Sequence, residues 1–393
     1  MELIQLIILL LIGYIVFTID TKQENFPVPT VLLLIGMGLS FLSFFGSIKV
    51  TENVIYHIFI PALLFISAYQ FPISGLKKNK QLITLLATVG IVLTVLLLGS
   101  ITWGISLLFM PLSFVSALVI AAILTPTDPV SVVSIIKKAT GNEQLANTVE
   151  GESMLNDGTS IVVYTSLAAL LQKSTSFHIT DFFVDFAITS IGGITVGLIC
   201  GFLVTKMIHY SHHRQYQLML SIILAYGSFM LAEQIHVSGV LAVVASGMMI
   251  SKAYGNSEKE DHFRASLDGF WEIIEVSLLA LLFLLIGIEI TEYLQVSYFV
   301  FGLCIFICTI IVRFIVIYLM SSIVQKHDYR YNLLMSWAGL KGSMSVFLIL
   351  SLSATNGSSD VTDKIVGICF SVVILSLIVQ SLTISPLAKK VLK

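Results

Sequence analysis

The segment Thr125-Pro126-Thr127-Asp128-Pro129 interrupts an apolar run that extends over residues 113–137. Two prolines three residues apart remove two backbone N–H donors and clash with the preceding turn, so this run is not expected to form a continuous helix. Such a break leaves backbone carbonyls unpaired and places the Asp128 carboxylate beside exposed helix ends, as at the midplane sites of secondary transporters. A simple proline kink is the alternative, but it gives no role to an aspartate held between the two prolines.

The composition of the chain is that of a polytopic membrane protein. Of its 393 residues, 56% are hydrophobic and only 11% are charged, against roughly a quarter charged in soluble domains. The mean hydropathy is +0.97, and apolar runs of about twenty residues, the length of one bilayer crossing, recur from end to end. These properties exclude a soluble globular enzyme. The formal net charge of −2 gives no reason to expect a nucleic-acid partner.

Apolar runs separated by polar breaks predict thirteen transmembrane helices. The predicted spans cover residues 3–19, 29–46, 54–73, 81–109, 113–137, 146–172, 180–207, 215–233, 237–253, 264–292, 296–324, 331–354 and 361–388. No loop between them is long enough to form a second domain. We therefore expect an all-α polytopic membrane protein in which residues 1–393 form a single transmembrane transporter domain.

The placement of the basic residues predicts the orientation of these spans. If the C-terminus is cytoplasmic, the outer loops hold only Lys49, Lys173 and Lys364. The cytoplasmic segments then hold Lys22, Lys77, Lys78, Lys80, Lys137, Lys138, Lys206, Arg214, Lys252, Lys259, Arg264, Lys326, Arg330, Lys389, Lys390 and Lys393. This bias follows the positive-inside rule and places the N-terminus outside.

Several polar and ionisable residues lie inside the predicted spans, where a charge costs roughly 2.5 to 3.5 kcal/mol at the bilayer centre and marks a functional site. Residues 146–172 contain Glu152, Ser153, Asn156 and Asp157. Because residues four apart share a helix face, Ser153 lies with Asp157, and Glu152 lies with Asn156 on a neighbouring face. Further cations, Arg313 and Lys341, follow in later spans.

The depth of these charges predicts that they meet. Asp128, Asp157, Arg313 and Lys341 lie roughly 14 to 17 Å from the cytoplasmic ends of their spans at about 1.5 Å per residue, and half of the hydrocarbon core is about 15 Å. Two acids and two bases at the midplane can offset the cost of burying each other. Glu152, five residues nearer the cytoplasm than Asp157, is expected to pair with Arg313. A purely structural set of ion pairs is the alternative, but it leaves the proline-rich break unexplained.

The order of the spans predicts an internal repeat. Residues 1–179 and 215–393 form two six-helix units of opposite orientation, joined by a linker helix at 180–214. The span with the proline break and the span with Gly339-Leu-Lys-Gly342 are each the fifth of their unit. Interrupted helices at corresponding positions of two halves indicate a transporter binding site, so the broken helices are expected to cross at the midplane.

Three glycines recur at four-residue spacing in the linker helix, at Gly193, Gly197 and Gly201. Such a ridge of small residues allows close packing against a neighbouring helix. A subunit interface is the alternative interpretation.

These residues together resemble the monovalent cation/proton antiporter family, in its sodium/proton exchanger branch. The resemblance rests on Thr125–Pro129, on Glu150–Gly158, on Arg313 and on Gly339–Gly342. It implies a core of helices at 81–172 and 296–388 and a second domain that forms a homodimer in the lipid bilayer of the plasma membrane.

The resemblance also implies a role for each residue. Asp157 would carry the proton and the cation alternately, and Asp128, Ser153 and the Thr127 carbonyl would supply further oxygen ligands for Na⁺. Glu152 and Arg313 would form a structural pair, and Lys341 would tune the site. Asn156 before Asp157, in place of a second aspartate, accompanies electroneutral exchange of one cation for one proton.

Two positions depart from the family pattern. Lys341 replaces the arginine that is usual there, and Ile66 stands where the family commonly has an acidic residue. The second difference removes an expected ligand from the span at 54–73 and leaves the cation preference open.

The expected function is therefore the exchange of Na⁺, or of Li⁺ or K⁺, for H⁺ by competition at Asp157 and alternating access. A K⁺/H⁺ antiporter of the same fold is the closest alternative. A cation channel is a weaker one, because the chain has no carbonyl-filter motif. Neither an enzymatic activity nor a cofactor is expected, since the chain has no metal-binding His-Glu-x-x-His and no Gly-x-Ser-x-Gly motif.

Overall fold

The protein is described by a computed structural model that covers residues 2–23, 28–46, 48, 51–128, 130–172, 179–208, 213–254, 261–293, 295–324, 328–356 and 359–391. Within these ranges all regular structure is helical, and one isolated antiparallel bridge joins Asp128 to Leu340. Of the residues named above, the following lie outside the described ranges: Lys49, Pro129, Lys173, Lys259, Lys326 and Lys393.

The first half of the chain forms the following elements. They are α1 (Leu3–Gln23), α2 (Val28–Ser40), α3 (Glu52–Val54), η1 (Ile55–Phe59), α4 (Ile60–Gln70), α5 (Ile73–Leu85), η2 (Leu86–Gly90), α6 (Ile91–Phe109), α7 (Phe114–Ile123), α8 (Val130–Thr140) and α9 (Glu143–Gln172). Two of them, η1 and η2, are single π-helical turns that continue directly into α-helices. Such turns are frequent at functional sites.

The second half of the chain is equally helical. Its elements are α10 (Ile179–Ile208), α11 (Arg214–Gln234), α12 (Gly239–Tyr254), α13 (Asp261–Ile290), η4 (Thr291–Tyr293), α14 (Val296–Val324), α15 (Tyr329–Trp337), α16 (Ser343–Asn356), α17 (Asp360–Leu375), η5 (Ser376–Gln380) and α18 (Ser381–Val391). A third π-helical turn, η5, lies between α17 and α18.

The helix lengths are those of a membrane protein. Among the described residues, eight helical segments are long and apolar enough to cross a membrane, and five shorter apolar helices accompany them. Every predicted span overlaps a described helix, so the prediction of an all-α, multi-pass protein is confirmed. The number of crossings and the inverted relation of the two halves remain predictions.

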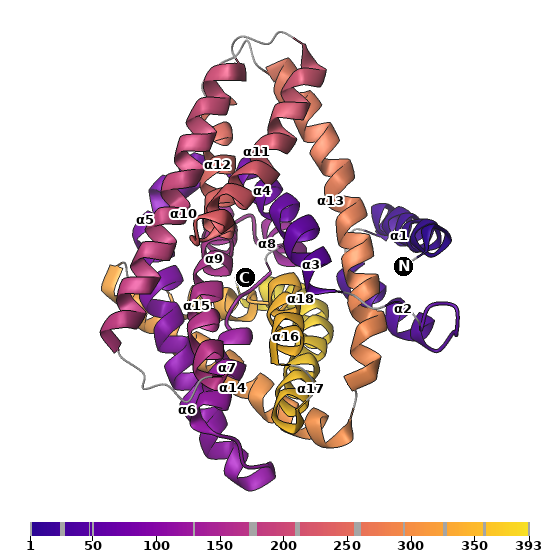
Figure 1. Ribbon diagram of the computed structural model, residues 1–393, viewed down its shortest axis with the longest axis vertical. Helices are drawn as coiled ribbons and strands as arrows, with labels where there is room; N and C mark the ends of the chain where they lie inside the picture. The colour runs from indigo at the N-terminus through magenta and orange to yellow at the C-terminus, as the bar shows by residue number, and fades with distance from the viewer. Residues whose placement is uncertain are drawn as a thin grey trace.

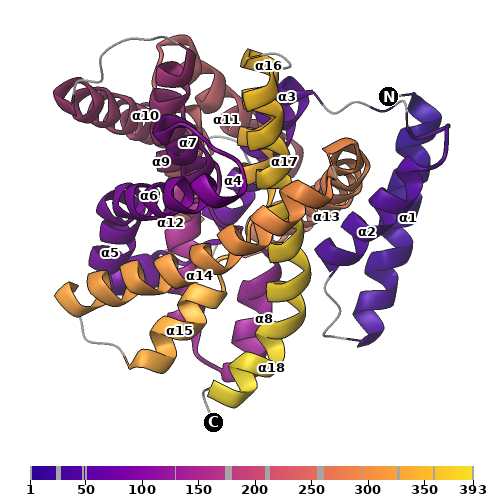
Figure 2. The same ribbon diagram turned by 90° about the horizontal axis from the view of Figure 1, so that it is seen from below.

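The helices pack as two groups. The helices α5 to α9 and α14 to α18 contact mainly one another, and we call this group the core bundle. The helices α1, α2, α4 and α10 to α13 form the flanking bundle, in which α13 lies along α2 and α10 lies along α12. Figures 1 and 2 show α1 and α2 at one edge beside α13, on the far side of the molecule from α10.

The predicted glycine ridge lies at the contact between α10 and α12. A Cβ atom on Gly193 or Gly197 would collide with the backbone carbonyl of Ser238 or Ala242, and one on Gly201 would collide with the side chain of Met249. These glycines therefore let two helices of the same chain approach closely. The alternative of a subunit interface is wrong for this face of α10, because α12 covers it.

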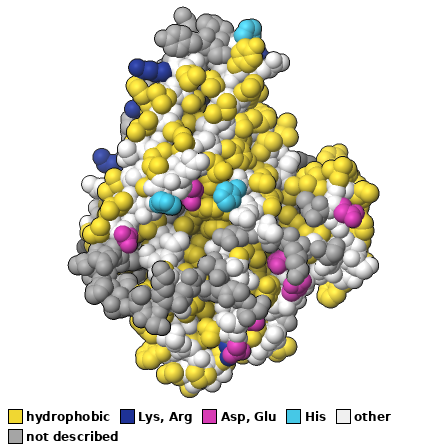
Figure 3. Space-filling view, viewed as in Figure 1, with side chains coloured by type: hydrophobic (Ala, Val, Ile, Leu, Met, Phe, Trp, Pro, Cys, Tyr) yellow, Lys and Arg dark blue, Asp and Glu magenta, His cyan; other side chains and the backbone are white. Residues whose placement is uncertain are grey.

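The outer surface is apolar over large areas, and Figure 3 shows hydrophobic side chains spread over the face that it displays. On α10, for example, Ile188 is 60% exposed and Ile191 is 64% exposed. Exposed apolar side chains on long helices contact lipid, so this surface suits the interior of a bilayer.

Candidate ion-binding site

Two interrupted helices cross in the middle of the core bundle. The first interruption separates α7, which ends at Ile123, from α8, which begins at Val130. The intervening backbone cannot satisfy its own polar groups as a helix does, and the N–H of Asp128 instead donates a 2.8 Å hydrogen bond to the carbonyl of Leu340. The predicted break is therefore present, and its partner is the other interrupted helix.

The second interruption, between α15 and α16, is explained by its two glycines. A Cβ atom on Gly342 would collide with the carboxylate of Asp128, and one on Gly339 would collide with the guanidinium of Arg313. Only a residue without a side chain lets the two unwound segments and Arg313 approach this closely. Glycine is thus required on both sides of Lys341 because a side chain would collide with its neighbours, and not because the backbone there must be flexible.

Asp157 lies on α9 beside this crossing, in an enclosed position. The residue is 8% exposed. Its Oδ1 atom is buried and has no hydrogen-bond partner among the described residues. A buried carboxylate oxygen with no donor is costly unless a proton, a cation or a water molecule reaches it. The Oδ1 atom of Asp157 can therefore accept one of them.

A small cavity of about 40 Å³ joins Asp157 to Asp128. Its other polar lining residues are Ser343 from the core bundle and Ser67 from the flanking bundle. The Oδ2 atom of Asp128 accepts hydrogen bonds from the N–H and the hydroxyl of Ser343, at 3.4 and 3.5 Å. The two carboxylates thus share one enclosed space, which lies where the two bundles meet.

Asn156 fixes the unwound segment next to this cavity. Its Oδ1 accepts a 3.4 Å hydrogen bond from the N–H of Thr127, and its Nδ2 donates at 3.0 Å to the Thr127 hydroxyl. The hydroxyl of Ser153 donates a short hydrogen bond to the Thr127 carbonyl. The predicted ligands Thr127 and Ser153 are therefore adjacent, and Asn156 is placed as a support for them.

The predicted pair between Glu152 and Arg313 is present. Both terminal nitrogens of Arg313 bind the Glu152 carboxylate, at 3.2 and 2.7 Å, and both residues are buried. Glu152 also accepts a 2.8 Å hydrogen bond from Asn156 Nδ2. A bidentate pair of this kind holds its members in a fixed geometry, so α14 is connected through Glu152 and Asn156 to Thr127.

Lys341 reaches the site in a way that the sequence did not predict. Its buried ammonium donates to the carbonyls of Thr125 and Pro126, both at 3.4 Å. These are carbonyls that the proline break removed from the helical hydrogen-bond pattern. Because Lys341 donates hydrogen bonds to these two carbonyls, fewer carbonyls at the break are free to bind a cation than the sequence predicted.

Two further residues, Ser376 and Gln380 of the π-helical turn η5, hold the segment that carries Lys341. The Ser376 hydroxyl accepts a 2.9 Å hydrogen bond from the N–H of Lys341 and donates at 2.5 Å to Gln380 Oε1. Gln380 Nε2 donates at 2.8 Å to the carbonyl of Trp337, the last residue of α15. Neither residue was predicted from the sequence, although a Ser and a Gln four residues apart within an apolar span are a usable signal.

Ile66, the departure noted in the sequence, is buried in α4 and does not line the small cavity. The neighbouring Ser67 lines it instead. The flanking bundle therefore offers this site a hydroxyl and no carboxylate from α4.

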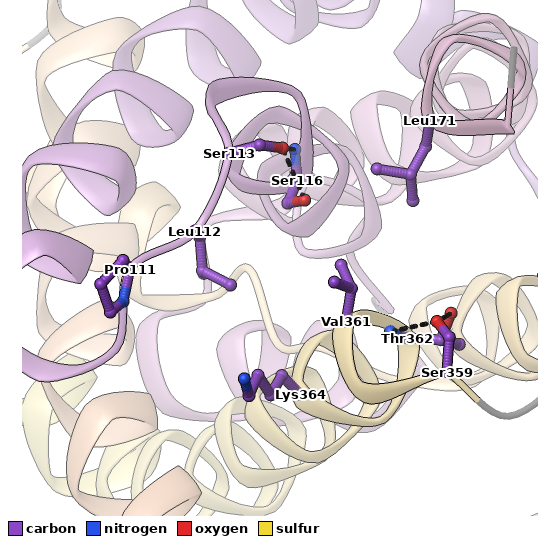
Figure 4. Close-up of a pocket in the computed structure, with 9 residues that line it drawn as sticks. All are labelled: Pro111, Leu112, Ser113, Ser116, Leu171, Ser359, Val361, Thr362 and Lys364. Atoms are coloured by element: carbon purple, nitrogen blue, oxygen red, sulfur yellow. Dashed lines mark hydrogen bonds between the residues drawn. The ribbon is translucent and has the colours of Figure 1, made fainter. Parts of the chain in front are cut away.

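A larger cavity of about 430 Å³ lies apart from these residues (Figure 4). It is bounded by Ser113 and Ser116 near the start of α7 and by Ser359 and Thr362 at the start of α17, which form hydrogen bonds within each pair. Its lysine, Lys364, pairs with Asp360 at 2.5 Å. None of the predicted site residues lines this cavity, so we do not assign it to ion binding.

Comparisons with known proteins agree on one family. A model of the transmembrane sodium/hydrogen exchanger family matches residues 6–390. The chain is 31% identical over 342 residues to the Na⁺/H⁺ antiporter NhaP of Pseudomonas aeruginosa, covering 85% of this chain and 80% of that protein. It is 30% identical over 396 residues to the Na⁺/H⁺ antiporter NhaG of Bacillus atrophaeus, covering 95% of this chain and 72% of the relative.

A solved structure has the same fold. The sodium proton antiporter MjNhaP1 from Methanocaldococcus jannaschii superimposes with a TM-score of 0.79, at 22% sequence identity and over 100% of both chains. The overall helical fold is therefore shared over the full length of both chains.

Proposed function

The chain belongs to the sodium/hydrogen exchanger family, and we propose that it is a secondary active antiporter that exchanges Na⁺ for H⁺ across the membrane. The observation that carries this proposal is the Asp157 carboxylate, whose buried Oδ1 has no hydrogen-bond partner among the described residues, in a cavity shared with Asp128. A transporter family is not a class of enzymes, and no catalytic activity is proposed.

Exchange follows from competition for a single carboxylate. Na⁺ is a hard cation that prefers oxygen ligands, and a carboxyl group must lose its proton before it binds a metal ion. Asp157 therefore holds either a proton or a cation at any moment. If the loaded site alone can change its exposure from one side to the other, each ion is carried in exchange for the other.

The ligands that we propose for Na⁺ are Asp157, Asp128, the Ser153 hydroxyl and the Thr127 carbonyl. Asn156 would set the position of Thr127 through its two hydrogen bonds to that residue. Glu152 and Arg313 would act as a structural pair, since they bind each other in a bidentate geometry. Lys341 would place its amino group near the two aspartates and tune their affinity for a cation.

A one-for-one, electroneutral exchange is the stoichiometry that this site favours. A proton and a monovalent cation neutralise the same single charge on Asp157, so the loaded site carries the same net charge in both halves of the cycle. The buried pair of Glu152 and Arg313 adds no net charge. A membrane potential, worth about 2.3 kcal/mol per charge per 100 mV, would then neither drive nor oppose the cycle.

Alternating access would arise from movement of one bundle against the other. The small cavity takes Asp128, Asp157 and Ser343 from the core bundle, and Leu64 and Ser67 from the flanking bundle. A shift along this boundary would expose the carboxylates to one side and then to the other.

We propose that the flanking bundle also forms a homodimer. We further propose that the protein lies in the plasma membrane with a cytoplasmic C-terminus, where it would contribute to pH homeostasis.

The proposal is tested by ion-driven proton movement in proteoliposomes that contain a pH-sensitive dye. Addition of NaCl to the wild type should change the internal pH, and Asp157→Asn should abolish this change while the protein still inserts. Retained exchange in Asp157→Asn would refute the role of this residue. Additions of LiCl and KCl identify the cation: a response to K⁺ without one to Na⁺ would favour the K⁺/H⁺ alternative, and conduction without proton movement would favour a channel.

Stoichiometry is measured in the same vesicles. A voltage imposed with a potassium gradient and an ionophore should leave the initial rate of Na⁺-driven proton movement unchanged. A rate that rises or falls steeply with voltage at fixed ion gradients would contradict one-for-one exchange.

A further inference from the structure

A second cavity lies along the boundary between the two bundles. It has a volume of about 420 Å³ and is enclosed by α5 and α9 of the core bundle and by α10 and α12 of the flanking bundle. That volume is within the range of small-molecule binding sites, about 300 to 1,000 Å³. We call this cavity the boundary slot.

The wall of the boundary slot is apolar except at one end. Of the described residues that line it, only Lys80, Thr84 and Lys252 are polar, and the others include Leu155, Leu198 and Leu241. Leu198 on α10 is 44% exposed, so the slot communicates sideways with the surface that faces lipid. An apolar molecule in the bilayer can therefore enter it without crossing water.

The two lysines lie on the same side of the membrane. Lys252 is in the last turn of α12, and its neighbour Ser251 donates a 3.0 Å hydrogen bond to the carbonyl of Phe71, just before α5 begins. The end of α12 is thereby joined to the start of α5, the helix that carries Lys80. The orientation predicted from the basic residues makes this the cytoplasmic side.

Neither lysine is neutralised within the part of the chain that the structure describes. Both side chains are exposed, and neither forms an ion pair with any residue that the structure describes. Two exposed ammonium groups beside an apolar slot are complementary to a molecule with an anionic head and a hydrocarbon tail. Basic residues near a membrane surface attract anionic lipid headgroups in this way.

The depth of the slot matches one leaflet. Leu241 and Lys252 are eleven residues apart on α12, which at about 1.5 Å per residue corresponds to roughly 16 Å. Half of the hydrocarbon core is about 15 Å. A molecule with its phosphate at the two lysines would thus extend an acyl chain to Leu241 and to Leu155, which is two residues from Asp157.

From this juxtaposition we propose that the boundary slot binds an anionic phospholipid of the cytoplasmic leaflet, with its phosphate between Lys80 and Lys252 and one acyl chain among the apolar residues. The lipid lies between α9, which carries Asp157, and α12 of the opposite bundle. It therefore occupies the boundary along which the two bundles would move, and it stabilises the arrangement in which the slot is open.

The test measures bound lipid and not transport, so its result does not depend on the ion that the protein carries. Delipidated full-length protein is titrated with palmitoyl-oleoyl phosphatidylglycerol or with the corresponding phosphatidylcholine, and binding is followed by native mass spectrometry. One phosphatidylglycerol should bind more tightly than phosphatidylcholine by about 25-fold, because each lysine near an anionic headgroup contributes about fivefold.

Two variants locate the site. Lys80→Gln combined with Lys252→Gln should reduce phosphatidylglycerol binding to the level of phosphatidylcholine, whereas Lys206→Gln, an exposed lysine in the last turn of α10 that does not line the slot, should leave it unchanged. Leu198→Trp should fill the slot and displace the lipid without altering charge. Leu203→Trp is its matched control, since Leu203 is 55% exposed on the same helix and does not line the slot.

Equal binding of the two lipids to the wild type would overturn the proposal. So would unchanged phosphatidylglycerol binding in the double lysine variant, or in Leu198→Trp protein whose thermal unfolding matches that of Leu203→Trp. If Leu198→Trp does not fold, the double lysine variant decides the question, because both of its substitutions lie on exposed side chains.

Discussion

The backbone N–H of Asp128 donates its hydrogen bond to the carbonyl of Leu340, so the two interrupted helices are joined at the residue that carries a site carboxylate. Residues next to this hydrogen bond also connect the two interrupted helices. Gly342 lies against the Asp128 carboxylate, and Lys341 donates hydrogen bonds to the carbonyls of Thr125 and Pro126. The geometry of the crossing and the position of the carboxylate are therefore set together.

A methyl group at Gly342 should disrupt this crossing. In Gly342→Ala the new Cβ would overlap the Asp128 carboxylate, which must shift. We expect Na⁺-driven proton movement to fall by at least tenfold, the effect of about 1.4 kcal/mol on the site. Gly104→Ala on α6 is the matched control, because a Cβ there meets nothing within 4 Å. Wild-type activity in Gly342→Ala would show that the carboxylate is free to move.

Loss of the η5 contacts should weaken cation binding. Ser376→Ala removes the partner of the buried Lys341 N–H in the unwound segment, and Gln380→Leu removes the partner of the Trp337 carbonyl at the end of α15. One such hydrogen bond is worth about 1 kcal/mol, so the KM for Na⁺ should rise about fivefold while kcat changes less. Ser371→Ala is the control, since among the described residues that hydroxyl donates within its own helix, to the carbonyl of Gly367. A fall in kcat at constant KM would contradict a role in positioning.

Separating Glu152 from Arg313 should lower stability more than removing both. Arg313→Met leaves a buried carboxylate unpaired, which costs about 3 to 5 kcal/mol, and the additional change Glu152→Gln should restore part of the loss. Thermal unfolding in detergent measures both. Arg264→Met is the control, because its partner Asp268 is at 3.9 Å and both side chains are exposed. Equal unfolding temperatures for the single and double variants would argue against a structural pair.

Competition at Asp157 predicts a defined effect of pH on transport. At equal pH on both sides, the KM for Na⁺ should fall by about tenfold for each unit of pH increase while Asp157 is mostly protonated, because cation binding must displace that proton. The maximal rate should stay constant. Uptake of radioactive sodium over a range of concentrations and pH values measures both quantities. A maximal rate that follows pH at a constant KM would show that protonation acts at another group.

The interrupted helices and most of the site could be predicted from the sequence because they depend on residues with strong local effects. Two prolines around Asp128 prevent a regular helix wherever they occur, and the depth of Glu152 and Arg313 in their spans limits which partners they can reach. The contact of Lys341 with two carbonyls was not predictable in this way. It depends on the relative position of two segments more than two hundred residues apart in the chain.

The support from η5 was missed for a different reason. A π-helical turn inserts into an otherwise regular helix and leaves the apolar pattern of the span intact, so hydropathy does not reveal it. The role of the turn at Ser376–Gln380 follows only from the hydrogen bonds that its side chains form with the backbone of Lys341 and Trp337. Ser67 was not predicted because it lines the small cavity only through the packing of two bundles, which the sequence of its own helix does not reveal.

The size of the small cavity has a consequence for ion choice. Its volume of about 40 Å³ leaves room for a few water molecules at most, since one water needs roughly 10 to 15 Å³. An alkali ion cannot enter such a space with its hydration shell, and each water that it sheds must be replaced by an oxygen of the protein. Discrimination between Li⁺, Na⁺ and K⁺ is then a balance between the cost of dehydration and the fit of the bare ion among a few oxygens of nearly fixed position.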